Sequence, residues 1–425
     1  MMKRFLAAIA AAALVAGCSS GQPKQAELAA PKKNEPVKLQ MLAMKQAAYS
    51  DEHVNEMVKK FTEANPNISV EITFVPYESL HDKLVTDQAS GSGQFDVALV
   101  DEIWPAEFAA ANVIQDITPR LTPEMKSGIN PAVLNILAVG DKYYGVPWIL
   151  DTKFLFYNKK MLADAGFKEP PKTWDELIKM AKAMKEKKIV EYPIAWSWGQ
   201  AEAVVCDYTQ LVYSFGGDIL GPDGAPKFQE GAALDTLKWM VGTLNDGISN
   251  PNSITYLEED VRQVFQEGKA AFVLNWTYMY GLANDPKESK VAGQVGIAPT
   301  PSAKAAIGVS GSMGLAITRS TKHPEEAWKL ISFLTSEQTQ KPYASDSLPI
   351  WKAALDASDL KADKELVAVA KAQFAAVKGR PQFVPWYNHF STKLQVAIQN
   401  ALVKKASPED ATKALVKEIE PLRKK

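Results

Sequence analysis

The stretch KYYGVPWILDTKFLFYNKKMLADAGFKEPPKTWDEL, residues Lys142–Leu177, guides the interpretation of the whole chain. Its first half is an apolar run with several aromatic side chains, which predicts a strand buried on both faces. One carboxylate, Asp151, interrupts this run. An unpaired charge is costly to bury, so the carboxylate must be hydrogen-bonded or solvated. Asp151 therefore either makes a salt bridge or turn within the fold, or points into a wet cleft.

The second half predicts a short helix, a stop at Gly166, a Pro-Pro turn and a new helix with Thr173 as its N-cap. The ordered pattern YGVPW…D…L.YNK.ML..AG…PPKTWDEL resembles the central region of family 1 extracellular solute-binding proteins. These are the sugar-capturing receptors of ABC importers, related to the maltose- and trehalose-binding proteins. The resemblance implies that this segment makes the first crossing between two lobes, with the ligand beside it.

Length and composition are typical of a soluble globular protein with room for two or three domains: 425 residues, of which 46% are hydrophobic and 23% charged. The formal net charge of -1 gives no electrostatic reason to expect binding to nucleic acid or to an anionic membrane. Ten Trp and thirteen Tyr are a generous supply of aromatic side chains. Such residues line binding clefts as well as cores.

The N-terminus predicts export. A basic pair followed by the apolar run Phe5–Val15 is typical of a signal peptide, and this run is shorter than the about 20 residues that span a bilayer. The next residues, up to Cys18, resemble the lipobox of bacterial lipoproteins; an ordinary signal peptide with an accidental Cys is the alternative. Residues 1–17 are thus expected to be a lipoprotein signal peptide, and residues 18–36 an acylated Cys18 with a flexible, polar tether.

Strands alternate with helices after the tether, which predicts a doubly wound α/β lobe. Ligands of such lobes bind at the carboxyl ends of the strands. Asp101 and Trp104 follow a buried strand and Tyr49 follows the first strand, so all three are candidate ligand-binding residues. The alternatives are an N-cap role for Asp101 and a packing role for Trp104. The predicted elements are strands Val37–Met44, Ile68–Phe74 and Phe95–Val100, and helices His53–Glu63 and Tyr77–Ala89.

A second α/β unit follows the crossing. Trp196 and Trp198 alternate in a predicted strand, Ile194–Trp198, so their side chains share one face and either floor a sugar site or join the core. Trp276 and Tyr278 come just after another strand, which favours the cleft. The carboxylates of Leu257–Asp260 start a helix and are interpreted as partners of its dipole. The predicted helices are Trp174–Lys187, Gln200–Ser214, Ala232–Asn245 and Leu257–Glu267.

Later segments resemble the family's other crossings. Gly308–Ile317, with Gly311 and Ser312, resembles the return crossing, where glycine lets backbone approach a ligand. Asp346–Trp351 resembles the third crossing. The phrase RPQFVPWYNHFS, which begins at Arg380 and includes Trp386, resembles the family's approach to its last long helices, near the ligand.

Enzymatic motifs are missing from the sequence. The four histidines, at positions 53, 81, 323 and 389, lack metal-ligand spacing, and neither a C-x-x-C nor a G-x-S-x-G motif occurs. No metal, cofactor or catalytic residue is expected. With Cys18 acylated, Cys206 is the only free thiol, and it is expected to be a small buried residue.

The expected fold class is α/β and periplasmic-binding-protein-like: two α/β lobes joined by three hinge crossings, with the ligand cleft between them. The crossings are expected near Trp148–Phe154, Ser310–Gly314 and Ser345–Trp351. Lobe 1 is expected to comprise residues 37–150 and 312–346, and lobe 2 residues 151–311 and 347–425. Aromatic faces would stack on sugar rings, and carboxylates would accept hydroxyl hydrogen bonds. The candidate ligand-binding residues are Tyr49, Asp101, Trp104, Trp148, Asp151, Trp196, Trp198, Trp276, Tyr278, Gly311, Ser312, Arg380 and Trp386.

The resemblance implies a lipid-anchored, monomeric receptor that captures a neutral mono-, di- or oligosaccharide by hinge closure. It would deliver this cargo to the transmembrane subunits of an ABC permease. It would work in the periplasm or on the outer face of the cell membrane, touch the membrane only through its anchor, and bind no nucleic acid. Two alternatives remain: a non-sugar cargo such as a polyamine, peptide or glycerol phosphodiester, for which Arg380 is the one positional cation, and a secreted carbohydrate-active enzyme.

Overall fold

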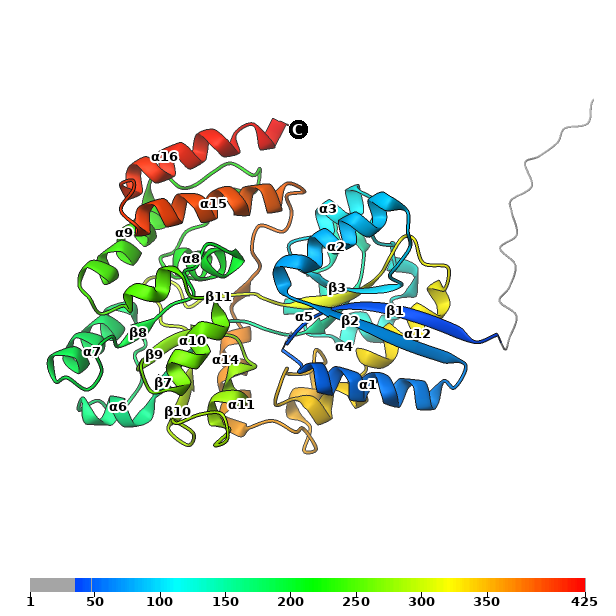
Figure 1. Cartoon of the computed structure of the whole chain (residues 1–425), viewed down its shortest axis with the longest axis horizontal. Coiled ribbons are helices and arrows are strands. Elements are labelled where there is room, and N and C mark those ends of the chain that lie inside the picture. The colour runs from blue at the N-terminus through cyan, green and yellow to red at the C-terminus, as the bar shows by residue number, and fades with distance from the viewer. Residues whose placement is uncertain (1–34, 47, 425) are drawn as a thin grey trace, which may run out of the picture. The chain divides into compact units, whose positions relative to one another are not determined.

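Strand β1 (Val37–Met44) lies between β2 and β3 in the sheet of the first lobe, and its bounds match the predicted strand. It pairs in parallel with β2 and β3, whereas β12 runs antiparallel between β3 and β6. The order of the sheet is β2-β1-β3-β12-β6. Figure 1 labels its first three strands, β2, β1 and β3. Every side chain of β3, β6 and β12 is buried, which accounts for their near-continuous apolar sequence. The other strands of this sheet are β2 (Ile68–Val75), β3 (Val97–Asp101), β6 (Val146–Ile149) and β12 (Met313–Ile317).

Helices pack against this sheet to complete lobe 1. Ser50 caps α1 by accepting a hydrogen bond from the His53 amide, and α2 ends at Gly91, whose positive φ of 65° suits glycine. The helices are α1 (Asp51–Ala64), α2 (Tyr77–Ser90), α3 (Pro105–Ala110), α4 (Pro123–Gly128), α5 (Pro131–Leu134), α12 (Pro324–Leu334) and α13 (Glu337–Gln340), beside the hairpin β4 (Ala138–Val139) and β5 (Lys142–Tyr143).

Lobe 2 has a four-stranded mixed sheet in the order β10-β7-β9-β8. Its strands are β7 (Phe154–Asn158), β8 (Ile194–Ala195), β9 (Phe272–Asn275) and β10 (Val295–Ala298). The sequence marks α7 clearly, because Thr173 and Glu176 form a reciprocal capping box. The helices are α6 (Lys159–Asp164), α7 (Trp174–Glu186), α8 (Glu202–Ser214), α9 (Gly231–Asn245), α10 (Glu258–Gln266), α11 (Met279–Asn284), α14 (Lys364–Phe374), α15 (Tyr387–Leu402) and α16 (Pro408–Ile419).

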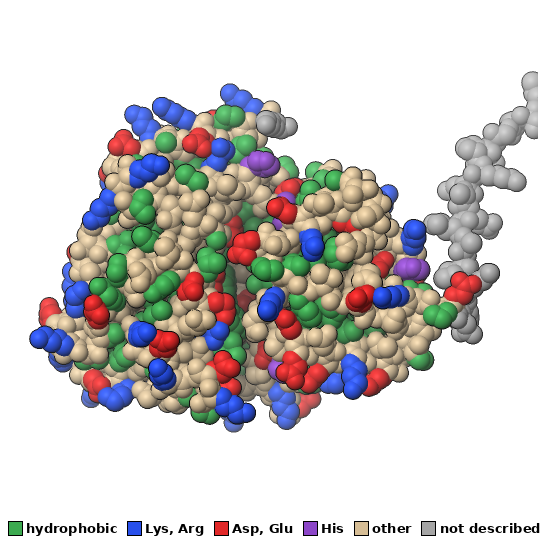
Figure 2. Space-filling model, viewed as in Figure 1, with side chains coloured by type: hydrophobic (Ala, Val, Ile, Leu, Met, Phe, Trp, Pro, Cys, Tyr) green, Lys and Arg blue, Asp and Glu red, His purple; other side chains and the backbone are tan. Residues whose placement is uncertain are grey.

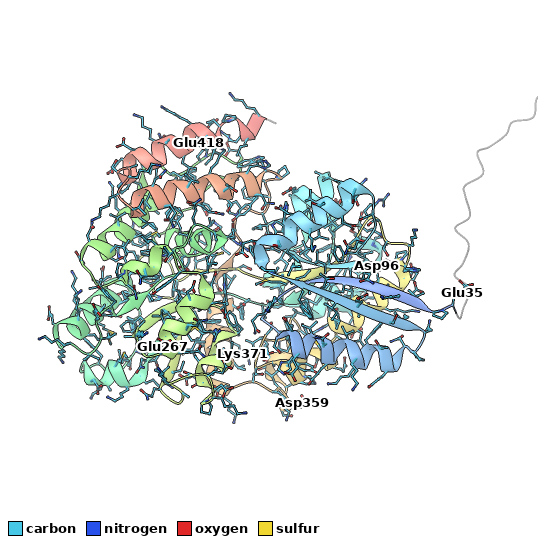
Figure 3. The ribbon with its side chains drawn as sticks, in the orientation of Figure 1. Glu35, Asp96, Glu267, Asp359, Lys371 and Glu418 are labelled. Atoms are coloured by element: carbon cyan, nitrogen blue, oxygen red, sulfur yellow. The ribbon has the colours of Figure 1, made fainter. Side chains whose placement is uncertain are left out.

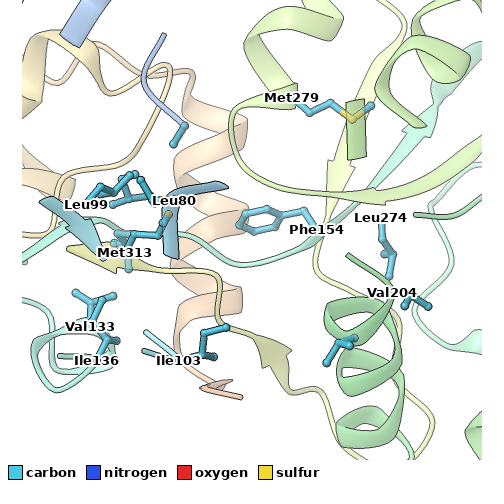
Figure 4. Packing of buried hydrophobic residues seen from close by; sticks show 14 of the residues in the cluster. Leu80, Leu99, Ile103, Val133, Ile136, Phe154, Val204, Leu274, Met279 and Met313 are labelled. Atoms are coloured by element: carbon cyan, nitrogen blue, oxygen red, sulfur yellow. The ribbon is translucent and has the colours of Figure 1, made fainter. Parts of the chain in front are cut away.

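These elements belong to a computed structural model that describes residues 35–46 and 48–424, and Pro36–Lys425 form one compact unit. The predicted signal peptide, the acylation of Cys18 and nearly all of the tether lie outside the described residues. Leu99 and Met313 belong to the core on the lobe 1 side, and Phe154 and Leu274 to the core of lobe 2 (Figure 4). No helix among the described residues is long and apolar enough to cross a membrane.

The single buried strand predicted around Asp151 is wrong, because the apolar run forms two strands in different sheets. β6 pairs with β12 in lobe 1, and β7 pairs with β9 and β10 in lobe 2. Residues 150–153 connect them and make the first crossing. The continuous apolar pattern arises because both strands are fully buried, each in its own lobe.

The return crossing runs beside the first one. It lies between the short strand β11 (Gly308–Val309) and β12. The Ser312 hydroxyl donates to the Asp151 carbonyl at 3.2 Å and accepts from the Asp151 amide at 3.1 Å. The Thr152 hydroxyl donates to the Val309 carbonyl at 2.7 Å. The two segments that cross between the lobes are thus hydrogen-bonded to each other.

The third crossing between the lobes was predicted near Ser345–Trp351, but it lies later in the chain. Asp346 is 2.5 Å from His53 of α1, and the Trp351 indole donates to the Thr335 carbonyl at 2.7 Å, so this segment packs on lobe 1. Asp359 still pairs with Lys341 beside α13, at 3.0 Å, and the chain then enters lobe 2 through α14 (Figure 3). Residues 347–351, expected in lobe 2, therefore lie with lobe 1.

Candidate ligand-binding cleft

A cavity of about 610 Å³ opens between the two lobes. Figure 2 shows the groove from outside, with acidic side chains along it. Its volume falls within the range of about 300–1,000 Å³ that is usual for small-molecule sites. Among the described residues, seven carboxylates line it, together with two cations, Lys45 and Arg380. The carboxylates are Glu78, Asp101, Asp151, Glu202, Glu258, Glu259 and Asp260, and the aromatic lining residues are Tyr77, Trp276 and Tyr278.

The first turns of three helices contribute to this wall. They are those of α2 with Glu78, α8 with Glu202 and α10 with Glu258. The partial positive charge at a helix N-terminus stabilises nearby carboxylates. The starts of these three helices therefore place several carboxylate acceptors in one cavity, where they can accept hydrogen bonds from hydroxyls.

Arg380 joins carboxylates from both sides of the cavity. Its guanidinium donates to Asp101 at 2.7 Å and to Glu202 at 2.8 Å, and it is only 3% exposed. Burial alone would lower the pKa of Arg380, but the surrounding carboxylates, Asp101 first, raise it well above its usual value. The group is therefore permanently charged and already paired.

Glu102 lies behind this cluster and is completely buried. Its carboxylate accepts from the Arg380 amide at 3.1 Å, and the Arg380 Nε is 3.5 Å away. Burial raises the pKa of Glu102 to about 7, even though the charge of Arg380 opposes that rise. Near neutral pH the Glu102 side chain is therefore divided between its neutral and charged forms.

The free energy of unfolding is expected to fall as pH rises from about 4.5 to 7. Over this window folded Glu102 keeps its proton while the unfolded chain has lost it, so the unfolded state binds fewer protons. Glu102→Gln should remove this pH dependence. The difference in free energy of unfolding between the variant and the wild type should therefore rise by up to about 3 kcal/mol from pH 4 to pH 8. Urea unfolding of both proteins at pH 4 and at pH 8 measures this change. An equal difference at both pH values would contradict the expectation.

Asp151 lies in the first crossing with its carboxylate at the cavity. Its Oδ1 accepts from the Thr277 hydroxyl at 2.6 Å, from the Thr277 amide at 3.0 Å and from the Thr152 amide at 2.9 Å. Burial raises the pKa of Asp151 to about 6, and the Thr277 hydrogen bonds limit the rise. Asp151 is therefore hydrogen-bonded within the fold through Thr277 and Thr152 rather than held by a salt bridge, and it also lines the cavity.

Trp276 is the half-buried indole of the cavity and follows β9 directly. Its Nε1 donates to Glu258 at 3.3 Å, and the Lys153 ammonium lies 4.9 Å from its ring centroid. Gly311 of the return crossing approaches so closely that a Cβ there would lie 2.5 Å from the six-membered ring. The indole orientation is therefore fixed by lobe 2 and by a crossing together.

Tyr278 and Gly311 also line the cavity, so it brings together Asp101, Asp151, Trp276, Tyr278, Gly311 and Arg380 from the sequence candidates. The Tyr278 hydroxyl donates to Glu259, which also pairs with Arg262 at 2.6 Å. Ser312 is buried and holds the two crossings together without lining the cavity.

Three other candidates, Tyr49, Trp104 and Trp148, lie in the lobe 1 core, and the sequence offered a packing alternative only for Trp104. Tyr49 is fully buried, packs on Trp148 at a centroid distance of 5.1 Å and accepts a hydrogen bond from Gln340. Trp148 is 1% exposed. Trp104 stacks on Tyr77 and contacts His81 and Phe108, so its role is the packing alternative.

The paired tryptophans of lobe 2 are likewise core residues. β8 ends at Ala195, so Trp196 and Trp198 lie beyond the strand, yet their rings stack at 5.0 Å and an angle of 6°. Trp196 also packs against Trp174 and Trp239. Trp386 packs edge-on against Phe390 and lies away from the cavity lining.

Sequence reasoning missed most of the acidic lining. Glu258 and Glu259 were interpreted as partners of the helix dipole, whereas both also face the cavity, and Glu202 and Glu78 had no role. The available signal is their position at the first turn of a helix. Cys206 is buried in the lining, and burial raises the pKa of its thiol, so it stays protonated. Among residues 35–46 and 48–424 no cluster of His, Cys, Asp and Glu could hold a metal ion.

Two mixed α/β lobes with a polar, aromatic cleft between them define a two-lobed ligand-binding protein. The chain belongs to the family of bacterial extracellular solute-binding proteins, whose model matches residues 47–341. The expected family and fold class are thereby confirmed. The family consists of transporter solute-binding proteins rather than enzymes, and its members work outside the cytoplasm.

Relatives cover most of the chain. MalE3 of T. maritima, solved with maltose bound, is 32% identical, with a TM-score of 0.85 over 91% of this chain and 100% of its own. A solute-binding protein of Thermotoga lettingae bound to alpha-D-tagatose is 27% identical, with a TM-score of 0.82 over 91% and 99%. A probable ABC transporter-binding protein of Deinococcus radiodurans is 30% identical over 82% of this chain and 85% of its own.

Proposed function

We propose that the protein captures a neutral sugar or polyol in the interlobe cavity and delivers it to an ABC permease. The observation that carries this proposal is the lining of the cavity, which combines aromatic side chains with carboxylate acceptors. Trp276, Tyr77 and Tyr278 offer apolar faces for a sugar ring. Glu258 and Asp151 offer carboxylates to its hydroxyls. The maltose of MalE3 and the tagatose of the T. lettingae protein support this class of cargo.

The charges of the cavity argue against an anionic cargo. Arg380, the expected partner for a phosphodiester, is already paired with Asp101 and Glu202. The other lining cation, Lys45, is exposed and faces a lining with seven carboxylates. A phosphate would meet net negative potential there. The same excess of carboxylates favours a polyamine as the second candidate cargo.

The remaining features of the proposal concern how the receptor works in the cell. Acylation of Cys18 would hold it at a membrane in the periplasm or on the outer cell surface, and the signal peptide of residues 1–17 would be removed. The closed, monomeric receptor would present both lobes to the permease subunits. Catalysis is not part of the proposed role, so the bound sugar should leave unchanged.

A screen by thermal shift and calorimetry tests this function. The chain from Ser19 onward is suitable, because Pro36–Lys425 form a compact unit with every described helix and strand. Maltose, mannitol, tagatose and longer oligosaccharides are compared with spermidine and a glycerol phosphodiester. A ligand at 100 times its Kd should add about 2.7 kcal/mol of stability.

We expect stabilisation by a neutral sugar or polyol, with the same compound recovered by chromatography. Stabilisation by spermidine alone would show that the cargo is a polyamine rather than a sugar, while the proposed receptor function would stand. Hydrolysis of a bound oligosaccharide would overturn the receptor function itself.

A further inference from the structure

Arg380 connects the two lobes across the cleft. It follows strand β13 (Val377–Lys378), which pairs with β11, and β11 lies beside α8 in lobe 2. The Tyr213 hydroxyl of α8 also donates to the Gly379 carbonyl, next to Arg380, at 2.7 Å. Its partner Asp101 is the last residue of β3 in lobe 1. The ion pair between them, at 2.7 Å, therefore spans the cleft, whereas the pair with Glu202 at 2.8 Å stays within lobe 2.

We propose that the ion pairs of Arg380 with Asp101 and Glu202, here called the Arg380 tie, hold the cleft closed without any ligand. In this way they determine the affinity for cargo and the selectivity for its charge. The closure step needs only the fold, while the effect on cargo rests on the proposed function. A planar guanidinium suits this role, because its fixed fork reaches two carboxylates at once, which a lysine ammonium cannot reproduce.

Both acceptors of this tie are held in place by neighbours on their own lobe. The Tyr77 hydroxyl and the Ile103 amide donate to Asp101 at 3.0 and 3.1 Å. The Tyr387 hydroxyl donates to Glu202 at 2.6 Å, and Ser391 also donates to it. Each carboxylate is thus positioned before the lobes meet, which reduces the ordering cost of forming the pair.

A second contact lies on the same side of the molecule. The Asn388 amide of α15 donates to Glu107 of α3 at 2.8 Å, and its nitrogen lies 2.7 Å from His81 of α2. Asn388 and Arg380 belong to one stretch of lobe 2, so opening on this side breaks both contacts together. The closed arrangement therefore has protein-only support from Asn388 as well as from Arg380, whose backbone amide also donates to Glu102 of lobe 1.

The tie also affects the charge of a cargo. Asp101 and Glu202 both pair with Arg380 in the closed cleft, so a neutral molecule can bind without leaving either carboxylate unpaired. Without the guanidinium, carboxylates from opposite lobes would face each other, and closure would need a cation from outside. Arg380 thus acts as an internal counter-cation.

Small-angle X-ray scattering of the chain from Ser19, measured without any sugar, tests the closure. Arg380→Gln should increase the radius of gyration, and methylguanidinium chloride should reduce it again where equal sodium chloride does not. Asp101→Asn, which weakens the pair from lobe 1, should also open the cleft. Arg120→Gln is the matched control, because Arg120 pairs with Glu325 inside lobe 1, and it should leave the radius unchanged.

Calorimetry tests the effect on cargo, with maltose, mannitol and spermidine as probes. Arg380→Gln should weaken neutral binding by about 5- to 150-fold, the usual size of a conformational coupling, and strengthen spermidine binding. Unchanged scattering of folded Arg380→Gln and Asp101→Asn would overturn the tie. If Arg380→Gln does not fold, Asp101→Asn alone decides. Absence of sugar binding by the wild type would count against the proposed function, while the scattering result would stand.

Discussion

Trp276→Ala is expected to weaken binding of the sugar found in the screen by about 10- to 100-fold, or roughly 1.5–3 kcal/mol. Trp276 has the largest aromatic side chain among the described residues that line the cavity, and the Glu258, Lys153 and Gly311 contacts hold it in one orientation. A sugar ring would lose both the buried area and the preorganised face. Calorimetric titration of the wild type and the variant, with far-UV circular dichroism to verify folding, measures the loss.

Trp386→Ala provides the control. Its indole is half-buried like that of Trp276 and was an equal candidate from the sequence, but it packs against Phe390 away from the cavity. It should change affinity by less than about twofold, within the usual effect of remote substitutions. Equal losses in both variants, or unchanged affinity in Trp276→Ala, would remove Trp276 from the binding site.

The comparison of these tryptophans shows what the sequence could and could not predict. Trp196 and Trp198 lie in a predicted strand and Trp276 comes just after one, so local sequence makes all three candidates without showing which of them a helix will cover. In the structure Trp174 of α7 and Trp239 of α9 pack against Trp196 and bury the pair, whereas nothing comparable covers Trp276. Which strand end is covered depends on helices that come from elsewhere in the chain.

The acidic lining was missed for a related physical reason. Carboxylates at helix starts are stabilised by the helix dipole wherever the helix lies, so Glu258 at the start of α10 has an adequate local explanation. That α2, α8 and α10 begin at the same cavity is a property of tertiary packing. By contrast, β1, β2 and α7 were predictable almost to the residue, because alternation, caps and glycine stops are local signals.

Lys153→Met is expected to destabilise the protein by about 3–5 kcal/mol, the usual cost of breaking a buried ion pair from one side. Lys153 and Asp207 are both 0% exposed, and the ammonium bonds to Asp207 and, at 3.1 Å, to Ser197. Burial alone would lower the pKa of Lys153, but the Asp207 and Glu258 carboxylates outweigh it and raise the pKa. Without this cation Asp207 would be a charge buried without its counter-ion. Equilibrium urea unfolding measures the loss.

Lys160→Met is the matched control, because Lys160 pairs with Asp164 one helical turn away at the surface, at 2.5 Å. Exposed pairs of this kind contribute about 0.3–0.5 kcal/mol, so the control should hardly change the unfolding midpoint. Adding Asp207→Leu to Lys153→Met should recover part of the stability, since both charges are then gone.

Because the Lys153 ammonium also faces the Trp276 ring, Lys153→Met should weaken sugar binding even where the variant remains folded. A loss below 1 kcal/mol would mean that water reaches Asp207 and that the crossing tolerates an unpaired charge.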